Sequence, residues 1–272
     1  MNNIRDFIDN VNLETRLHDE YCSLEDENLF RNHCLEGFDK LIELKDSFKD
    51  RPAIVLGLGP SLLDLPKEKY KDHIKIVCND FHRVPGFFNE DFKPDFWCGA
   101  NNYDTLKDPF GLCIEQGIGC LITIPKKTEF ERFLKLSEGK QKHVFPWIWE
   151  HRIFQCMLAQ KYKVKMGYSH CNTVTNHMIA FALWLGCSSI EITGFDMSYR
   201  QAMKETGMTH AGFNYDSVSA DSSNHGHNAF DDTAERNQIM NDLKYLCTIA
   251  HHNNISVINH SYVANGLPEV LA

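Results

Sequence analysis

The sequence has no excess of positive charge, no long apolar run and no closely paired cysteines. Lys and Arg number 28 against 37 Asp and Glu, a formal net charge of −9 over 272 residues. This balance argues against nucleic acid as the main partner, because that binding needs a basic face. No run approaches the ~18 apolar residues of a membrane span, and the polar N-terminus lacks the apolar segment of a secretory signal. We therefore expect a cytoplasmic protein without a transmembrane segment.

The ten cysteines contain no C-x-x-C pair, and most lie in apolar runs, as Cys78 and Cys187 do. We interpret them as reduced thiols of the core. Apolar residues make up 43% and charged residues 24% of the chain, close to the averages of globular proteins. A chain of this length is expected to form one large domain, with or without an appended helical segment.

Short apolar runs alternate with helical stretches along most of the chain. This alternation predicts an α/β fold with a Rossmann-like, mostly parallel sheet and helices on both of its faces. The predicted strands are Ala53–Leu56, Ile74–Cys78, Phe96–Cys98, Cys120–Ile124, Ile190–Thr193 and Ile255–Ile258. Residues 1–50 are predicted to form a helical extension, with apolar residues at helical spacing between Leu35 and Phe48, and residues 51–272 form the predicted catalytic domain.

Two further helices are predicted in the second half of the chain. Asn172–Gly186 has a polar start, an apolar middle and a glycine stop, which indicates a buried helix with a cap at each end. Thr173 and Thr175 at its start could face a ligand or cap the helix, and we favour capping for Thr173. Asp231–His251 regains helical spacing. The polar stretch between them, residues 198–227, is interpreted as a functional lid or a disordered segment.

A turn with two glycines follows the first predicted strand: Gly57-Leu58-Gly59-Pro60-Ser61. Glycine permits a close approach of a ligand that a side chain would block. Pro60 suits the first turn of a helix, whose free N–H groups bind anions, so the turn is predicted to hold the phosphate of a nucleotide. A purely structural turn is the alternative. The turn lacks the third glycine of a dinucleotide fingerprint and the lysine of a P-loop, which disfavours dinucleotides and triphosphates.

Polar residues end three of the predicted strands. They are Asn79-Asp80, Asn101-Asn102 and Gly194-Phe195-Asp196. Each group alone is a common turn former. Since ligands of open parallel sheets bind beyond the carboxyl ends of the strands, the three groups and the glycine turn are predicted to form one rim, where amides could bond a base or sugar and Asp196 could accept hydroxyl groups.

These motifs occur in the order found in the small bacterial sialyltransferases that decorate lipooligosaccharides, and the chain resembles that family over roughly residues 53 to 270. The matching stretches are Gly57–Leu62, Cys78–Phe81, Asn101 or Asn102, Leu185–Asp196, Gly226-His227 and Val257–Ser261. The chain departs from the family at Leu58, where an asparagine is usual. It departs again at Tyr199, which lies beyond the position expected for the family's tyrosine.

The resemblance implies a metal-independent glycosyltransferase without a further cofactor. It would move a sialic-acid-like sugar from a CMP-type nucleotide-sugar donor to a glycan or glycolipid acceptor. His227 would be the general base, although a solvated loop histidine is the alternative, and Tyr199 and Tyr215 would donate hydrogen bonds to the leaving phosphate. The predicted nucleotide site comprises Gly57, Leu58, Gly59, Pro60, Ser61, Asn79, Asn101, Asn102, Thr175, Gly194, Phe195, Asp196 and Ser261. No metal ligand is predicted under this hypothesis.

The same skeleton resembles a second family, which includes flagellin-glycosylation accessory proteins and an archaeal 6-hydroxymethylpterin diphosphokinase. Its patterns are similar to Gly57–Leu62, Pro94-Asp95 and Gly194–Asp196. This resemblance implies magnesium-dependent pyrophosphate transfer, with Asp80, Asp95 and Asp196 as candidate ligands of the metal. A non-catalytic nucleotide-binding module is a third hypothesis. Under any of them, the acidic helical extension could pack on a second copy of the chain.

Overall fold

The protein folds around one parallel sheet. The computed structural model describes residues 40–100, 103–124, 132–133, 135–140, 143–148, 157–159, 161–164, 173–196, 211–212 and 233–261. Within this part of the chain, seven strands pair in the order β5-β4-β3-β2-β1-β6-β7, and every neighbouring pair is parallel. The strands are β1 (Ala53–Leu56), β2 (Ile74–Cys78), β3 (Phe96–Gly99), β4 (Gly119–Ile124), β5 (Val144–Ile148), β6 (Ser189–Thr193) and β7 (Ser256–Asn259). The predicted Rossmann-like α/β fold is confirmed.

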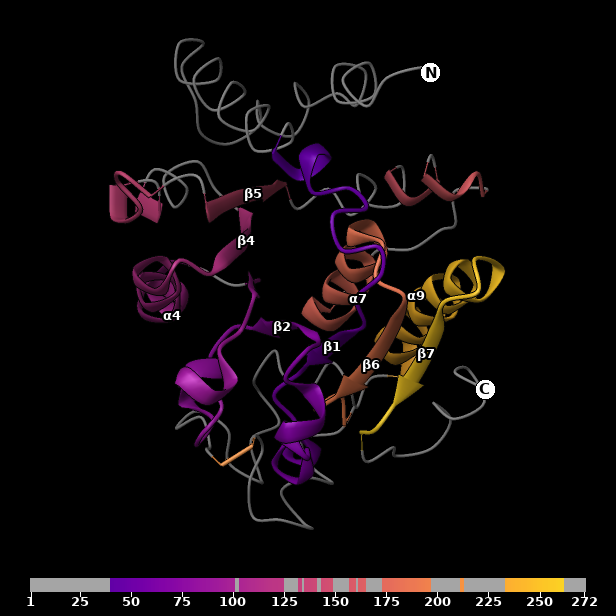
Figure 1. Ribbon diagram of the computed structural model, residues 1–272, viewed down its shortest axis with the longest axis horizontal. Coiled ribbons are helices and arrows are strands. Elements are labelled where there is room, and N and C mark those ends of the chain that lie inside the picture. Colours follow the sequence, from indigo (N-terminus) through magenta and orange to yellow (C-terminus); the bar gives the residue numbers. More distant parts are fainter. Residues whose placement is uncertain are drawn as a thin grey trace.

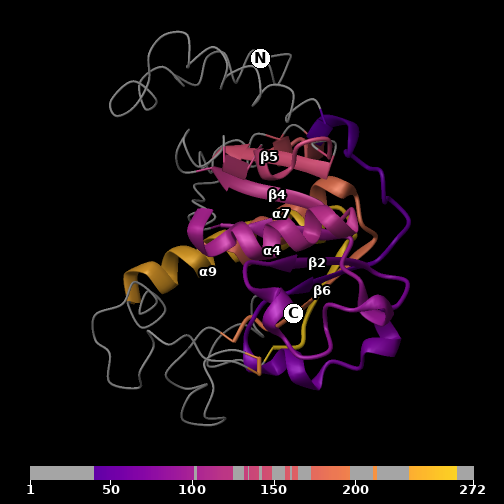
Figure 2. The same ribbon diagram turned by 90° about the vertical axis from the view of Figure 1, so that its left-hand side faces the viewer.

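Helices cover both faces of the sheet, as Figures 1 and 2 show. The long helices are α4 (Tyr103–Gln116), α7 (Val174–Leu185) and α9 (Thr233–His252). The short 3₁₀ helices are η1 (Pro60–Asp64), η2 (Lys67–Tyr70), η3 (Phe81–Arg83) and η4 (Glu90–Phe92). Helices α7 and α9 lie on one face, and α4 lies on the other together with the 3₁₀ helices.

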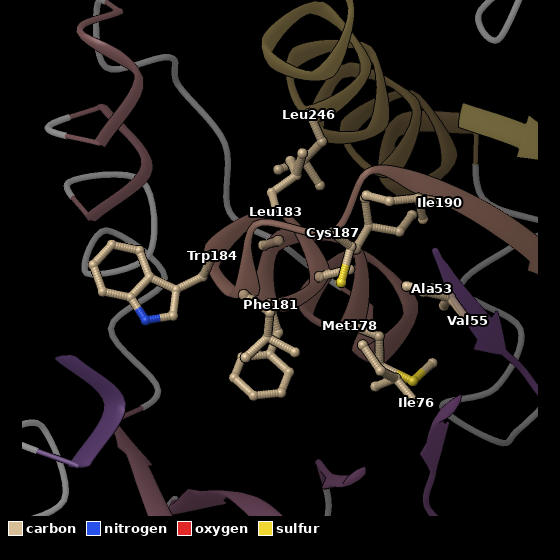
Figure 3. Close-up of a cluster of buried hydrophobic side chains, with 14 of the residues drawn as sticks. Ala53, Val55, Ile76, Met178, Phe181, Leu183, Trp184, Cys187, Ile190 and Leu246 are labelled. Carbon is tan, nitrogen blue, oxygen red and sulfur yellow. The ribbon is translucent and has the colours of Figure 1, made fainter. Parts of the chain in front are cut away.

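Side chains of successive strand residues alternate between the two cores. In β1, Val55 packs into the core under α7, whereas Ile54 and Leu56 pack into the core under α4. Figure 3 shows Met178 of α7 beside Ile76 of β2. Because strands buried on both faces are mostly apolar, the short apolar runs of the sequence predicted six of the seven strands to within a residue or two.

Strand β5 was not predicted from the sequence. It contains Pro146, a residue without a backbone N–H group, and proline is confined to edge strands or strand ends. The structure resolves this conflict because β5 lies at one edge of the sheet and pairs only with β4 among the described strands.

The predicted helical extension ends earlier than its spacing suggests. Residues 40–43 are helical, but residues 44–50 form turns. Asp46 adopts a left-handed backbone (φ 58°), and its N–H group donates to Trp184 O at 3.1 Å. The N–H group of Phe48 likewise donates to Leu185 O at 3.0 Å. The helical prediction for residues 44–50 was wrong because these two N–H groups bond to the end of α7, which interrupts the helical pattern of the stretch.

Both predicted caps of α7 are confirmed. The Thr173 side chain accepts a hydrogen bond from the N–H group of Asn176, and Gly186 adopts a left-handed conformation (φ 80°) at the C-cap. The described cysteines are buried and unpaired, in agreement with reduced core thiols. Within the described residues, no helix combines the length and the apolar character that a membrane crossing requires.

Candidate functional site

The sheet changes its direction of growth between β1 and β6. From β1 the chain adds β2 to β5 on one side, and β6 and β7 then lie on the other (Figure 1). In open parallel sheets, ligands bind beyond the carboxyl ends of the strands at such a switch point. The glycine turn after β1 and the Gly194–Asp196 turn after β6 both lie there, so the two strongest sequence motifs meet at the expected place.

The backbones of the two turns touch. Gly57 N donates to Thr193 O at 2.8 Å, and Gly59 N donates to Gly194 O at 2.8 Å. A Cβ atom on Gly57 would overlap the carbonyl oxygen of Gly194. Gly194 itself has a φ of 73°, a conformation that other residues rarely adopt. These two glycines are therefore required by the contact of the turns, whatever ligand lies above them.

Side chains extend the contact into a hydrogen-bond network. Ser61 Oγ accepts from Gly194 N at 3.0 Å, and Ser61 N donates to Asp196 Oδ2 at 2.9 Å. Ser261 Oγ accepts from Phe195 N at 2.8 Å. The structure thus brings together five residues that the sequence assigned to the site, from three separate parts of the chain. Their contact with a ligand stays a prediction.

The glycine turn was predicted to bind phosphate through free N–H groups, and this prediction needs correction. The N–H groups of Gly57, Gly59 and Ser61 all donate to protein acceptors, and Pro60 has none to offer. The helix that follows is a 3₁₀ helix of five residues. This helix begins at Pro60, as predicted. The carbonyl oxygen of Leu58 accepts from Ala211 N at 2.8 Å. Three of the four N–H groups of the turn therefore serve the protein, so the turn is chiefly a structural joint.

The end of β2 supplies an amide and a carboxylate. Asn79 adopts a left-handed backbone (φ 41°), and its Oδ1 accepts from Ala100 N at 3.0 Å. Its carbonyl oxygen accepts from Trp97 Nε1 at 2.8 Å, so both ends of the residue are fixed. Asp80 follows and is 6% exposed. Burial lowers the pKa of nearby His82, although Asp80 and Asp108 oppose the shift. This side of the rim thus carries a buried carboxylate beside an imidazole that burial keeps neutral.

One carboxylate lies on each side of the glycine turn, and the third predicted one lies at the other edge of the sheet. Asp80 follows β2 and Asp196 follows β6, and both strands flank β1. Asp95, the third predicted ligand, precedes β3 at the opposite edge, where its Oδ2 accepts from Lys75 N at 2.8 Å. The structure therefore does not bring Asp95 together with Asp80 and Asp196, because a residue before a parallel strand lies at the opposite edge from a residue after one. Among the described residues, no three His, Cys, Asp or Glu side chains form a metal-binding group.

Other predicted site residues are only partly placed. Thr175 lies in the first turn of α7 and is buried, and its contact with a ligand stays a prediction. Of the predicted lid, Ala211 and Gly212 are described, and Ala211 is buried in the core under α4. The remaining predicted residues lie outside the described part of the chain: Asn101, Asn102, Tyr199, Tyr215 and His227.

Sequence analysis missed a cluster of charged side chains around Glu191 in β6. The Glu191 side chain is 11% exposed. Its Oε2 atom lies 2.9 Å from Lys69 Nζ, 2.9 Å from Tyr70 Oη and 2.6 Å from His260 Nε2. Oε1 lies 3.6 Å from His73 Nε2. The available signal was a charge between two isoleucines in a buried strand, since a buried carboxylate needs partners. Those partners are distant in sequence and could not be identified from it.

The cluster keeps Glu191 ionised. Burial alone would raise the pKa of its carboxyl, but hydrogen bonds from Lys69, His260 and Tyr70 outweigh burial and lower the pKa to about 2 from the ordinary 4.5. The carboxylate therefore stabilises the fold above about pH 4.5, and this contribution is lost as the pH falls toward 2.

Replacing Glu191 with glutamine should thus destabilise the protein most at neutral pH. The shift corresponds to roughly 3 kcal/mol at about 1.36 kcal/mol per pKa unit, and screening of the half-exposed Lys69 reduces the expected loss to about 1–2 kcal/mol. Urea denaturation at pH 7 and pH 3 measures it, and the difference from wild type should fall by more than half at pH 3. Glu68→Gln, at an exposed surface pair with Lys71, is the control and should change little at either pH. An equal loss at both pH values for Glu191→Gln would contradict this account.

Comparison with known proteins gives one match. A family model described as 6-hydroxymethylpterin diphosphokinase MptE-like matches residues 27–202, which is more than half of the 272-residue chain. No curated protein and no solved structure matches the chain. The matched range contains the glycine turn, Asp80 and the Gly194–Asp196 turn. It corresponds to the second of the two families that the sequence resembles, and the sialyltransferase prediction gains no support.

Proposed function

Because the chain belongs to the 6-hydroxymethylpterin diphosphokinase MptE-like family, we propose that it transfers a diphosphate group from a nucleoside triphosphate to a hydroxymethyl group on a pterin-type heterocycle. The carboxyl edge of the sheet around the switch point between β1 and β6 would hold both substrates. The proposal replaces sugar transfer from a CMP-type donor as the leading hypothesis. A non-catalytic nucleotide-binding module remains an outcome that the experiments below can distinguish.

The observation that carries the proposal is the pair of carboxylates beside a turn that uses most of its amides within the protein. Polyphosphates are strongly anionic, and Asp80 and Asp196 would repel one in the absence of a cation. Since the N–H groups of Gly57, Gly59 and Ser61 are engaged within the protein, the turn has few amides left to offset this repulsion. A site of this composition suits a polyphosphate that arrives with a divalent cation.

The residues present fit magnesium. Mg²⁺ prefers oxygen ligands and is commonly held by one or two carboxylates, with water and substrate phosphates completing its coordination. Asp80 and Asp196 would be the protein's ligands. When bound, the ion would neutralise charge on the phosphates and polarise the phosphorus that is attacked. Such a site does not need the P-loop lysine, whose absence from the sequence had disfavoured a triphosphate.

The protein's own residues would orient the reaction. Ser61 N donates to Asp196 Oδ2 and so fixes the orientation of this carboxylate. The side-chain amide of Asn79, fixed through Oδ1, can donate from Nδ2 to a heterocycle or ribose. In the reaction the acceptor hydroxyl oxygen bonds to the β-phosphorus, the bond from this phosphorus to the bridging oxygen of the α-phosphate breaks, and nucleoside monophosphate leaves.

Exchanging Asp196 for asparagine should abolish transfer with little effect on folding. The amide oxygen can still accept from Ser61 N, so the turn is retained, whereas the charge that would hold a cation is lost. We expect at least a ~100-fold fall in the transfer rate, the order of effect of losing a metal's charge stabilisation of several kcal/mol. Asp72→Asn, an exposed carboxylate before β2, is the matched control and should leave the rate unchanged.

The proposed function is tested with purified protein, ATP, Mg²⁺ and reduced 6-hydroxymethylpterin, with AMP and the diphosphate ester followed by chromatography. Product should form and should disappear when EDTA is added. Activity toward a CMP-sugar that survives EDTA would return the sialyltransferase hypothesis to first place. Nucleotide binding without transfer of any group would instead favour a non-catalytic module.

A further inference from the structure

A histidine at the carboxyl end of β7 is hydrogen-bonded to a buried acid. His260 is the first residue after β7, and its N–H group donates to Ile192 O at 2.7 Å, which continues the pairing with β6. Its Nε2 atom lies 2.6 Å from Glu191 Oε2. The side chain is 36% exposed, against 11% for that of Glu191. A partly exposed imidazole is therefore hydrogen-bonded to a buried carboxylate.

The same short segment joins this pair to the turn that follows β6. Ser261, the next residue, accepts from Phe195 N, and Phe195 precedes Asp196. Ser261 N in turn donates to Asn259 Oδ1 at 3.1 Å, which fixes the turn that carries His260. The residue after His260 thus bonds to the turn that follows β6. His260 itself lies at the same carboxyl edge of the sheet.

The charged groups around Glu191 determine which nitrogen of His260 carries a proton. Lys69, Tyr70 and His73 face the carboxylate from η2 and from the residues before β2. Glu191 stays ionised through these contacts, so it can only accept a hydrogen bond. His260 must then present N–H at Nε2, which in the neutral ring leaves the lone pair on Nδ1. Within the described part of the chain, His260 makes no hydrogen bond other than those of Nε2 and its backbone N–H.

We propose that His260 is the general base of the transfer reaction and that Glu191 is its positioning residue. The assignment rests on the proposed function. Nδ1 accepts the proton of the acceptor hydroxyl as its oxygen bonds to the β-phosphorus of the nucleoside triphosphate. The bond to the α-phosphate oxygen breaks, nucleoside monophosphate leaves with the electron pair, and the proton on Nδ1 passes to solvent. A buried carboxylate that fixes the tautomer of a catalytic histidine is the same division of labour as in hydrolase triads.

The test compares wild type with His260→Ala, His260→Asn and Glu191→Gln in the transfer assay, together with nucleotide binding by calorimetry. Loss of a general base typically costs ~10²–10⁴-fold in rate. We therefore expect such a fall in kcat for both His260 variants, with nucleotide affinity unchanged. Glu191→Gln should reduce kcat less, by roughly tenfold, because the base remains but its tautomer is no longer fixed. His251→Ala, on an exposed histidine at the end of α9, is the matched control and should transfer at the wild-type rate.

Two readouts separate a catalytic from a structural role. Added imidazole should restore part of the activity of His260→Ala and none to wild type, because a free base can enter the space that the side chain leaves. The transfer rate of wild type should fall as the pH is lowered, and this acid limb should be missing from His260→Ala. If His260→Ala does not fold, His260→Asn keeps a polar side chain at that position. The fall in kcat and the missing acid limb are then measured on this variant, without the imidazole rescue.

The experiments distinguish a wrong assignment of the base from a wrong proposed function. Transfer by His260→Ala or His260→Asn at the wild-type rate would overturn the assignment of the base and leave the function intact. Loss of activity that imidazole does not restore, accompanied by weaker nucleotide binding, would also overturn it, since that pattern indicates a structural role. A wild-type protein that binds nucleotide but transfers nothing would overturn the function and the base assignment together.

Discussion

Alanine at position 57 should destabilise the protein by at least ~3 kcal/mol and abolish ligand binding. The added Cβ atom would overlap the carbonyl oxygen of Gly194, and this obstacle is backbone. Buried backbone cannot move aside as the end of a side chain can, so the two turns must separate. Separation would break the hydrogen bond from Gly57 N to Thr193 O and the one from Gly59 N to Gly194 O. Urea denaturation measures the loss of stability, and thermal shift with nucleotide measures the loss of binding.

Gly111→Ala provides the matched control. Gly111 lies within α4, and the nearest atom that its Cβ would meet is 3.9 Å away, which is ordinary contact. Because alanine is the better helix former by about 1 kcal/mol, this variant should be as stable as wild type or more so. Equal stability of Gly57→Ala and wild type would mean that the turns do not touch as described, and the site would lose the joint on which its geometry depends.

Most of the sheet could be predicted because its strands are local features of the sequence. Each central strand is a short apolar run, buried on both faces, and a polar or glycine residue marks its end. The caps of α7 are equally local, since Thr173 and Gly186 act within a few residues of themselves. The glycine turn and the β6 turn could be placed at one edge because parallel strands put their carboxyl ends together.

What could not be predicted depends on partners that are distant in sequence. The turns at residues 44–50 form because α7 offers carbonyl groups, and the sequence of the stretch alone favours continued helix. The amides of the glycine turn are engaged by the Gly194–Asp196 turn, more than 130 residues away, which changes the turn from a phosphate binder to a joint. Glu191 and His260 are 69 residues apart, one within β6 and one directly after β7, so the sequence could not pair them.

Lys161 supports the end of α7, and we expect its replacement with methionine to lower the stability of the protein substantially. The last carbonyl groups of a helix have no partners within it. Lys161 Nζ donates to Leu183 O at 2.6 Å and to Trp184 O at 2.8 Å, and it pairs with Asp46 Oδ1 at 2.6 Å. The side chain is 6% exposed. Burial lowers the pKa of Lys161 despite the opposing effect of Asp46, as expected for an ammonium group removed from water.

Methionine would keep the packing of the lysine stem and remove all three charge-assisted contacts. Loss of one partner of a buried pair costs ~3–5 kcal/mol, and because Asp46 is itself partly exposed and can be rehydrated, we expect about 3 kcal/mol. Urea denaturation measures the effect, with Lys163→Met, on an exposed lysine two residues away, as the control that should be close to neutral.

The Asp46→Asn change should cost much less in the Lys161→Met background than in wild type, since the pair is already broken. Additive losses would show that Lys161 acts through the α7 carbonyls alone.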